Sequence, residues 1–245
     1  MEQRPVCLSI GGSDSCAGAG IQADLQVFAE MGVKGCSAIT ALTAQNPRDI
    51  SRIEGAPLAQ LDAELHAVFD YYQIAVVKTG MLLDADHIAV VAAALQEHHA
   101  DRPLVIDPVM VASSGRRLLD AASIDTLCKA LMPLATLLTP NLDEAAVLLG
   151  RPVRNARADC RELVQMYGCA VLLKGGHGTG DTLLDLLCDT HGKFTDIEHP
   201  RLAWGESSAH GSGCRLAAAI TAGLARGKPM PDALRQAVSF CSPAE

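Results

Sequence analysis

The stretch Val6-Cys7-Leu8-Ser9-Ile10-Gly11-Gly12 is a short apolar segment that ends on two glycines, and residues 20–31 after it have the composition of a helix. The same alternation recurs along the chain, where the further predicted strands are residues 37–42, 74–77, 104–106, 137–138 and 171–173. Short apolar strands separated by helices are typical of a parallel sheet that is covered on both faces. The sequence therefore predicts an α/β fold with a mostly parallel central sheet and helices on both faces.

One segment departs from this alternation. Residues 181–197 are predicted to form an antiparallel hairpin at the edge of the sheet, with a turn at residues 190–192. No repeat, low-complexity tract or linker interrupts residues 1–245, of which 49% are hydrophobic. A chain of this length can bury one large core, so we expect a single domain.

Composition disfavours several classes of partner. A net charge of −8 argues against nucleic acid or an anionic membrane. No apolar run approaches the ~20 residues of a membrane span, and the N-terminus lacks a signal-peptide pattern. The nine cysteines form no C-x-x-C pair, and their odd number argues for reduced thiols. We therefore expect a cytoplasmic protein with neither a nucleic-acid nor a membrane partner.

A glycine-rich motif, His210-Gly211-Ser212-Gly213-Cys214, directly precedes an apolar, helix-forming run at residues 216–224. The first N–H groups of a helix have no partner within the helix, so they are available to an anion. Glycines on both sides of Ser212 let the main chain approach a ligand oxygen. A thiol in the first turn lies where the helix dipole favours the thiolate, so we expect a lowered pKa for Cys214. The motif predicts chemistry on a phosphate.

Polar residues also follow most of the predicted strands. One polar loop is unremarkable on a protein surface, but six in succession favour a binding site at the carboxyl edge of the sheet. They are Ser13-Asp14, Gln45-Asn46, Lys78-Thr79-Gly80, Asp107, Asn141 and Lys174.

Two common nucleotide signatures fail. Residues 18–23 match G-x-G-x-x-A, but the strand after them ends without the acidic residue that would bind a ribose. The Walker phosphate loop is absent from the sequence.

Two weaker patterns each leave two interpretations open. Asn141 and Glu144 lie three residues apart at a predicted helix start, where they would hold a hydrated Mg²⁺ or form a capping box. Lys174 precedes a glycine-rich strand exit that contains His177, and it would meet a phosphate or remain a solvated surface lysine. His177 would stack on a base or stay exposed.

Together these segments resemble the ribokinase-type small-molecule kinases, and more specifically the hydroxymethylpyrimidine/phosphomethylpyrimidine kinases of thiamine biosynthesis. The resemblance extends from Val6 to about Ala237, and its carriers are residues 9–15, 17–24, 40–46, 78–81, 107–110, 139–141 with Glu144, 174–177 and 210–214. Most ribokinase-type enzymes have Asp in the last glycine motif, whereas Cys marks this branch and some pyridoxal kinases. The resemblance implies a ribokinase-like fold and a homodimer.

The resemblance also implies an activity and its ligands. ATP and Mg²⁺ would phosphorylate the hydroxymethyl group of 4-amino-5-hydroxymethyl-2-methylpyrimidine, and then the resulting monophosphate. Cys214 would orient the hydroxyl and accept its proton, while the N–H groups of Gly211, Ser212 and Gly213 would neutralise the transferring phosphoryl group. The implied ligand contacts are Gly12, Asp24, Gln45, Met81 and Val109 for the pyrimidine, Lys174, His177 and Thr179 for the nucleotide, and Glu144, Asn141 and Asp107 for Mg²⁺.

The chain departs from the family pattern in several places. Ser212 stands for a Thr but keeps the hydroxyl, and residues 204–208 differ from the family's usual run. Arg215 follows the reactive cysteine, where it would bind phosphate or point to solvent, and the sequence ends at Glu245, short of the family's usual last helix. Two alternatives therefore stay open, namely a pyridoxal kinase-type kinase of heteroaromatic alcohols and a non-catalytic pyrimidine-binding sensor.

Overall fold

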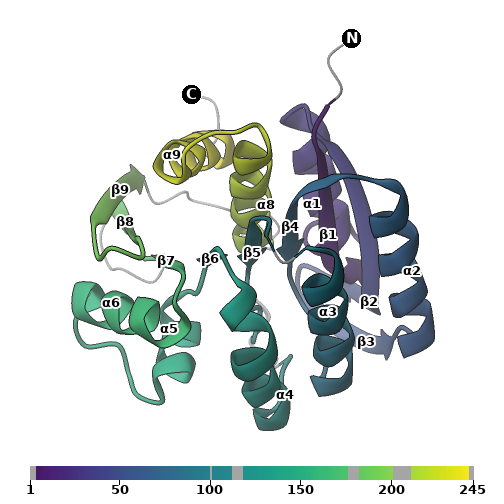
Figure 1. Cartoon of the computed structure of the whole chain (residues 1–245). Helices are drawn as coiled ribbons and strands as arrows, with labels where there is room; N and C mark the ends of the chain where they lie inside the picture. Colours follow the sequence, from purple (N-terminus) through teal and green to yellow (C-terminus); the bar gives the residue numbers. More distant parts are fainter. Residues whose placement is uncertain (1–3, 100, 112–117, 176–181, 201–210, 243–245) are drawn as a thin grey trace.

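The computed structural model describes residues 4–99, 101–111, 118–175, 182–200 and 211–242. These residues form a nine-stranded sheet in the order β3-β2-β1-β4-β5-β6-β7-β8-β9, with helices on both faces (Figure 1). The strands are β1 (Val6–Asp14), β2 (Lys34–Asn46), β3 (Asp49–Gly55), β4 (Ile74–Thr79), β5 (Leu104–Ile106), β6 (Leu137–Leu138), β7 (Ala170–Leu173), β8 (Thr182–Cys188) and β9 (Phe194–Pro200). The predicted α/β class is confirmed.

The central strands are parallel and the edges are antiparallel. Strands β2, β1, β4, β5, β6 and β7 pair in parallel. At one edge β8 pairs antiparallel with β7 and β9, so the predicted edge hairpin is confirmed. At the other edge β3 pairs antiparallel with the end of β2, which continues to Asn46 instead of ending near residue 42. This second hairpin was not predicted, because only Ile50 of β3 is buried and the strand has no apolar run.

The helices are α1 (Gly20–Glu30), α2 (Leu58–Tyr71), α3 (Ala85–His98), α4 (Ala121–Thr126), α5 (Leu142–Leu149), α6 (Ala156–Tyr167), α8 (Ser212–Ala225) and α9 (Met230–Cys241). A π-turn, Leu127–Leu131, and a 3-10 turn, Met132–Leu134, follow α4. No helix among the described residues is long and apolar enough to cross a membrane.

Local sequence signals explain several helix ends. The side chain of Asp84 accepts hydrogen bonds from the first N–H groups of α3, and Asn155 does the same for α6. Gly150 and Gly168 end α5 and α6 in the left-handed conformation, which glycine adopts at little cost.

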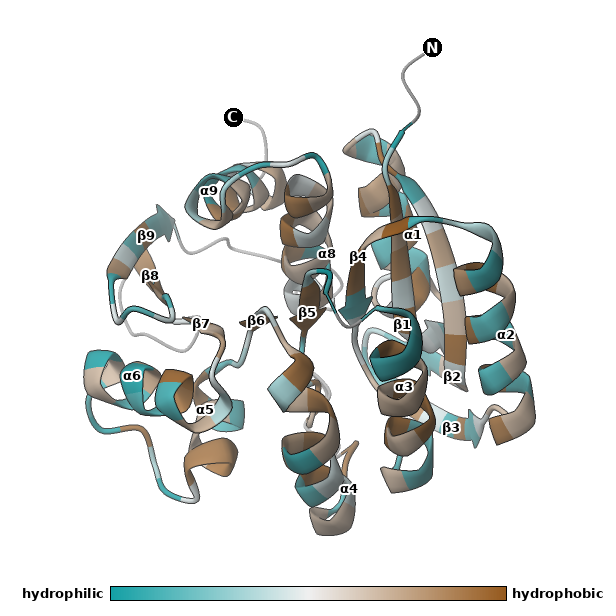
Figure 2. Ribbon diagram, in the orientation of Figure 1, coloured by the Kyte–Doolittle hydropathy of each residue, from teal (hydrophilic) through white to brown (hydrophobic). Residues whose placement is uncertain are grey.

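The sheet separates two apolar layers. Leu8, Ile10 and Ile106 belong to the cluster that includes α2, α3, α5 and α6, whereas their neighbours Cys7 and Val105 belong to the cluster with α1, α8 and α9. Successive strand residues point to opposite faces, so both sides of each central strand must be apolar. Figure 2 shows hydrophobic colour on β5 and along most of β4, whose end is hydrophilic.

Helix α8 links this scaffold to the predicted site. It packs against α1 and also contacts β1, β4 and β5. The start of α8 therefore lies with the β1–α1 loop and the carboxyl ends of central strands, which is where ligands bind in open α/β sheets.

Candidate active site

The site begins at Gly211, which precedes α8 in a left-handed conformation with φ of 80°. A Cβ atom at this position would lie 2.0 Å from the carbonyl oxygen of Gly18, so the backbone contact requires glycine. No side chain of the described residues caps the first N–H groups of α8. The helix start is therefore packed against the β1–α1 loop and keeps its N–H groups for a ligand.

The second glycine of the motif faces two charged groups. A Cβ atom at Gly213 would lie 3.3 Å from Lys174 Nζ and 4.0 Å from Asp107 Oδ2. These two side chains come from the ends of β7 and β5. The fold thus brings together three predicted site residues that are far apart in the sequence.

Lys174 and Asp107 form an ion pair with 3.0 Å between Nζ and Oδ1, and the hydroxyl of Thr139 donates to the same oxygen at 3.0 Å. Burial disfavours the charged forms of both groups. The attraction between the two charges outweighs this desolvation cost, so the pKa of Asp107 is lowered and the pKa of Lys174 is raised. Lys174 is only 14% exposed, so its interpretation as a solvated surface lysine is wrong.

A second buried ion pair lies nearby. Lys78 Nζ is 2.8 Å from Asp24 Oδ2, and the hydroxyl of Ser9 donates to the same oxygen at 2.5 Å. Burial opposes the ammonium charge, but Asp24, Cys214 and Asp107 together raise the pKa of Lys78. Lys78 was predicted to lie at the carboxyl edge of the sheet, but no contact with a ligand was predicted for it.

Cys214 is half-buried and lies among these charges. Burial raises the pKa of its thiol to about 11, and Asp107 and Asp24 add to this effect while Lys78 opposes it. The expected lowering of this pKa is therefore wrong. Loss of solvent and two nearby carboxylates outweigh the positive charge of Lys78.

Two predicted pyrimidine contacts are adjacent. A Cβ atom at Gly12 would lie 2.7 Å from Met81 Cε, and the hydroxyl of Thr40 donates to the Met81 carbonyl oxygen at 2.6 Å. The Met81 side chain thus covers the backbone at the end of β1. A third predicted contact, Asp24, is buried as the partner of Lys78 and Ser9.

Val109 and Gln45 lie at the ends of their strands. Val109 follows β5 with φ of 42°, a conformation that a β-branched residue rarely adopts and that is concentrated at functional sites. Gln45 lies near the end of β2, where its N–H donates to the hydroxyl of Ser15 at 2.9 Å and its carbonyl accepts from that hydroxyl at 2.8 Å. No hydrogen bond within the described chain joins Gln45 to the group around Cys214.

The capping-box interpretation of Asn141 and Glu144 is confirmed. The Asn141 side chain accepts from the Glu144 N–H at 2.8 Å, and Glu144 Oε2 accepts from the Asn141 N–H at 2.9 Å. Glu144 is also buried, and its Oε1 accepts from the N–H of Met110 at 3.2 Å. Burial raises the pKa of Glu144, against the opposing charge of Lys174.

A magnesium ion suits this donor set in part. Mg²⁺ is usually bound by one or two carboxylates together with waters and substrate phosphates. Asp107 holds both of its hydrogen bonds on Oδ1, and its Oδ2 faces the start of α8. Oδ2 of Asp107 therefore fits such an ion. Glu144 can join it only through the remaining lone pairs of its oxygens, because Oε1 and Oε2 each already accept a backbone N–H, as the amide oxygen of Asn141 also does.

Several sequence predictions fall outside the described residues, namely those on His177, Thr179 and His210. Arg215 is described, and its guanidinium lies 4.0 Å from the Glu30 carboxylate on α1. This contact lies between α8 and α1.

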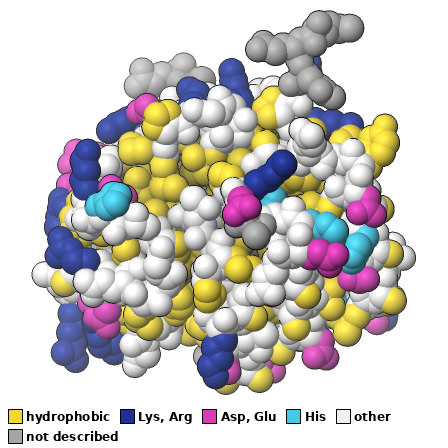
Figure 3. Space-filling view, in the orientation of Figure 1, with side chains coloured by type: hydrophobic (Ala, Val, Ile, Leu, Met, Phe, Trp, Pro, Cys, Tyr) yellow, Lys and Arg dark blue, Asp and Glu magenta, His cyan; other side chains and the backbone are white. Residues whose placement is uncertain are grey.

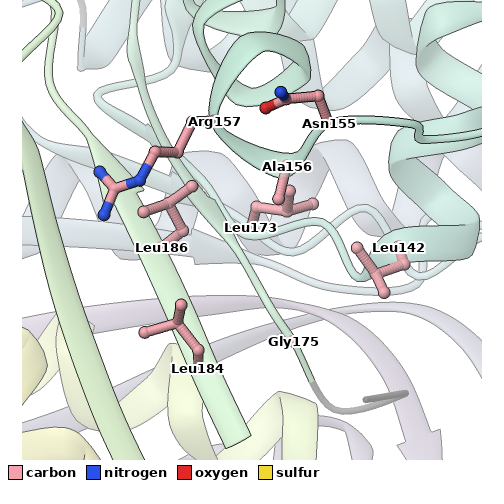
Figure 4. A pocket seen from close by; sticks show the side chains of 8 residues that line it. All are labelled: Leu142, Asn155, Ala156, Arg157, Leu173, Gly175, Leu184 and Leu186. Atoms are coloured by element: carbon pink, nitrogen blue, oxygen red, sulfur yellow. The ribbon is translucent and has the colours of Figure 1, made fainter. Parts of the chain in front are cut away.

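A separate apolar pocket of about 280 Å³ begins beside Gly175. Its lining comes from α5, α6, β7 and β8 (Figure 4) and consists of Leu142, Asn155, Ala156, Arg157, Leu173, Gly175, Leu184 and Leu186. Leu173 and Leu186 belong to the apolar layer on the α6 side of the sheet, so the pocket lies on the face opposite α8. It contains none of the predicted pyrimidine-binding residues.

The family model described as phosphomethylpyrimidine kinase matches residues 14–244. The chain belongs to this family. It is 41% identical over 239 residues to the hydroxymethylpyrimidine/phosphomethylpyrimidine kinase of Rhizobium meliloti, covering 96% of this chain and 88% of that protein. It is 42% identical to the thiamine biosynthesis bifunctional protein ThiED of Geobacter sulfurreducens, where the match covers 97% of this chain but only 48% of that relative. The chain therefore spans about half of the bifunctional protein.

Solved structures of the family and of a related kinase share the fold. The phosphomethylpyrimidine kinase of Clostridium difficile superposes with a TM-score of 0.85 at 33% identity, covering 97% of this chain and 98% of that one. An ADP complex of Bacillus subtilis pyridoxal kinase superposes with a TM-score of 0.86 at 32% identity, covering 97% and 90%. The likeness spans nearly the whole chain, so the ribokinase-like architecture implied by the sequence is confirmed.

Proposed function

We propose that this protein transfers the γ-phosphoryl group of ATP to the hydroxymethyl group of 4-amino-5-hydroxymethyl-2-methylpyrimidine, and then a second phosphoryl group to the monophosphate. The observation that carries the proposal is the position of Cys214, in the first turn of α8 and within the electrostatic reach of Lys78. Membership of the family and the activity for which its relatives are named support this choice of substrate.

The first transfer uses the charges around the start of α8. The substrate hydroxyl oxygen attacks the γ-phosphorus, the bond to the β-phosphate oxygen breaks, and ADP leaves. Free N–H groups of α8 and the ammonium of Lys174 stabilise the oxygens of the transferring group. The hydroxyl proton passes to the Cys214 thiolate, a minor form whose negative charge Lys78 favours.

The second transfer makes a weaker demand on Cys214. Its nucleophile is a phosphate oxygen, which is already ionised at neutral pH because the second pKa of a phosphate monoester is about 6. No proton has to be removed before attack. The same anion-binding groups therefore suffice for this step.

ATP use follows from the family. We also propose that the reaction requires Mg²⁺. Asp107 and Glu144 would hold the ion, with phosphate oxygens and waters completing its shell. When bound, it would neutralise charge on the nucleotide phosphates. We also assign His177 and Thr179 to the nucleotide, and Gln45, Met81 and Val109 with Gly12 and Asp24 to the pyrimidine.

The proposal is tested by measuring ADP release with the pyrimidine alcohol and, separately, with its monophosphate, and by identifying each product by mass. We expect ADP release to depend on the pyrimidine and the products to be the mono- and diphosphate. ADP release that is no faster with the pyrimidine than without it would contradict the proposal and support the sensor alternative.

Pyridoxal is the second candidate substrate, favoured by the structural match to a pyridoxal kinase. We expect the pyrimidine alcohol to have the higher kcat/KM when both alcohols are assayed at the same ATP concentration. A higher value for pyridoxal would reverse the assignment.

We further propose a homodimer in the cytoplasm. The nine cysteines are all free thiols, which is consistent with a reducing compartment. Light scattering during gel filtration would test the dimer, with a mass near the 25.7 kDa of one chain counting against it.

A further inference from the structure

Two histidines and a glutamate meet on the surface between α2 and α3. One coordinating atom from each of His66, Glu97 and His98 lies within 4.8 Å of the others. In Figure 3, histidine and acidic side chains gather over these two helices, at the right of the view. Because α2 and α3 cover the sheet face opposite α8, this cluster is separate from the active site.

Local hydrogen bonding fixes the ring of His66. Its Nδ1 lies 3.0 Å from the backbone carbonyl oxygen of Asp62, one turn earlier in α2. A carbonyl oxygen only accepts hydrogen bonds, so Nδ1 carries the proton and Nε2 has the free lone pair in the neutral ring. A hydrogen bond from one ring nitrogen to a backbone carbonyl is the usual support of a metal-binding histidine.

The ring of His98 is held in place by two neighbouring rings. Its ring stacks on Phe69 at a centroid distance of 5.3 Å and meets the ring of His66 edge-on at 5.1 Å. Its Nε2 is buried and has no hydrogen-bond partner within the described chain. The nearest carboxylate oxygen, Glu97 Oε1, is 3.8 Å away. An unsatisfied buried nitrogen is costly, and a bound cation would satisfy it.

The dimensions suit a transition-metal ion. Zinc binds histidine nitrogen at about 2.0–2.1 Å and carboxylate oxygen at about 2.0–2.2 Å, which places tetrahedral ligand atoms roughly 3.4 Å apart. The 3.8 Å separation between His98 Nε2 and Glu97 Oε1 needs only a small adjustment, whereas the wider separations in the cluster, up to 4.8 Å, need a larger one. Glu97 is 66% exposed, so its side chain is free to make that adjustment.

The surrounding charge also favours a cation. The carboxylates of Asp62, Asp70 and Glu97 all act on His66. Imidazole nitrogen is a poor ligand for Mg²⁺ but suits Zn²⁺, Ni²⁺ and Cu²⁺. The cluster therefore selects a different class of ion from the carboxylates of the active site.

We propose that His66, Glu97 and His98 form a binding site for one divalent transition-metal ion of the zinc type, with a water molecule as its fourth ligand. The ion links helix α2, through His66, to helix α3, through Glu97 and His98. Since it binds the folded arrangement of two helices, it stabilises the native state.

Titration of the full chain with Co²⁺ under a reducing agent that does not bind metal tests the site, because the free cysteines would compete for zinc. We expect one equivalent of Co²⁺ with weak visible bands from nitrogen and oxygen ligands and no thiolate charge-transfer absorption. His66→Gln should abolish this equivalent, and so should Glu97→Gln, which avoids disturbing the ring stack. His191→Gln, at an exposed histidine in the β8–β9 turn, should retain it.

Thermal unfolding with and without Zn²⁺ provides the second measurement. At a free metal concentration of about 100 times Kd, the folded-to-unfolded ratio should rise about 100-fold in the wild type and not in His66→Gln. The variants should keep normal kinase activity, so this test is independent of the proposed reaction. Thiolate charge-transfer bands in the wild type, or an equivalent retained by both variants, would overturn the site.

Discussion

Lys78 and Asp24 form an ion pair from which solvent is almost wholly excluded, with 2.8 Å between Nζ and Oδ2 and each residue about 1% exposed. The pair joins β4 to α1 directly beside the thiol of Cys214, whose pKa it influences. Burying two charges costs desolvation energy, which their mutual attraction and hydrogen bonds must offset. Here the two charges also act on the thiol of Cys214.

Lys78→Met should therefore destabilise the protein. It leaves the Asp24 carboxyl buried without its cation, which typically costs about 3–5 kcal/mol. The double variant Lys78→Met/Asp24→Asn has no buried charge and should recover much of this loss. The free energy of unfolding in urea tests both variants. If Lys78→Met were as stable as the wild type, the ion pair would make no net contribution to the free energy of unfolding.

Cys214→Ala should lower kcat for the first phosphorylation far more than it raises KM for the pyrimidine alcohol. The second phosphorylation should lose less, because its nucleophile is already ionised. Steady-state kinetics with the alcohol and with the monophosphate separate the two steps. The control is Cys241→Ala, at a half-buried thiol in α9. Equal losses for both substrates would identify Cys214 as a packing residue.

The rate of the first phosphorylation should rise with pH. Because the Cys214 pKa is raised to about 11, the thiol dominates at neutral pH and the thiolate fraction grows about tenfold per pH unit below that value. The measurement is the pH profile of kcat/KM from pH 7 to pH 9.5, as far as the fold tolerates. Cys214→Asp supplies a base that is already ionised, so its profile should be flatter. A flat wild-type profile would exclude the thiolate as the base.

Gly211→Ala should cost both stability and activity. The added Cβ would lie 2.0 Å from the Gly18 carbonyl oxygen, so the start of α8 must move away from the β1–α1 loop. Gly227→Ala is a matched control, since Gly227 also has a positive φ, of 76°, but has no neighbouring atom within 4 Å of the added Cβ. Left-handed strain alone costs about 1–2 kcal/mol, which both variants share. Comparable effects on ATP turnover would count against a special role for Gly211.

Substitutions at the capping box separate its structural role from metal binding. Glu144→Gln removes the charge, so it should raise the Mg²⁺ concentration for half-maximal activity. It also replaces one of two oxygens that accept a backbone N–H by an NH2 group, so it should cost about 1–3 kcal/mol of stability as well. Asn141→Ala should cost about 1 kcal/mol of stability without changing the Mg²⁺ requirement. Magnesium titrations combined with urea unfolding distinguish these outcomes. The opposite pattern would place the metal elsewhere.

The sequence predicted the fold where local pattern and tertiary environment agree. The central strands are apolar on both faces because both faces are covered, and this shows directly in short runs such as Val6 to Ile10. The edge strand β3 was missed because its side chains are mostly exposed and mixed in character. Its pairing with β2 comes from backbone hydrogen bonds, which leave little trace in side-chain composition.

The sequence predicted which residues make up the candidate site better than it predicted their ionisation. The glycine motif, Asp107 and Lys174 were recognised because backbone approach and phosphate binding demand particular residue types. The pKa of the Cys214 thiol was predicted in the wrong direction, because burial and two carboxylates from distant segments raise it and outweigh the opposing charge of Lys78. The cluster of His66, Glu97 and His98 likewise needs two helices to be packed together before it exists.

Sequence alone thus determined the alternation of strands and helices, the glycines at close backbone contacts and the chemical types at the strand ends, since these depend on neighbours along the chain. Only the tertiary structure decided which charges are buried against which partners, because ionisation depends on solvent exclusion and on groups brought close from distant segments.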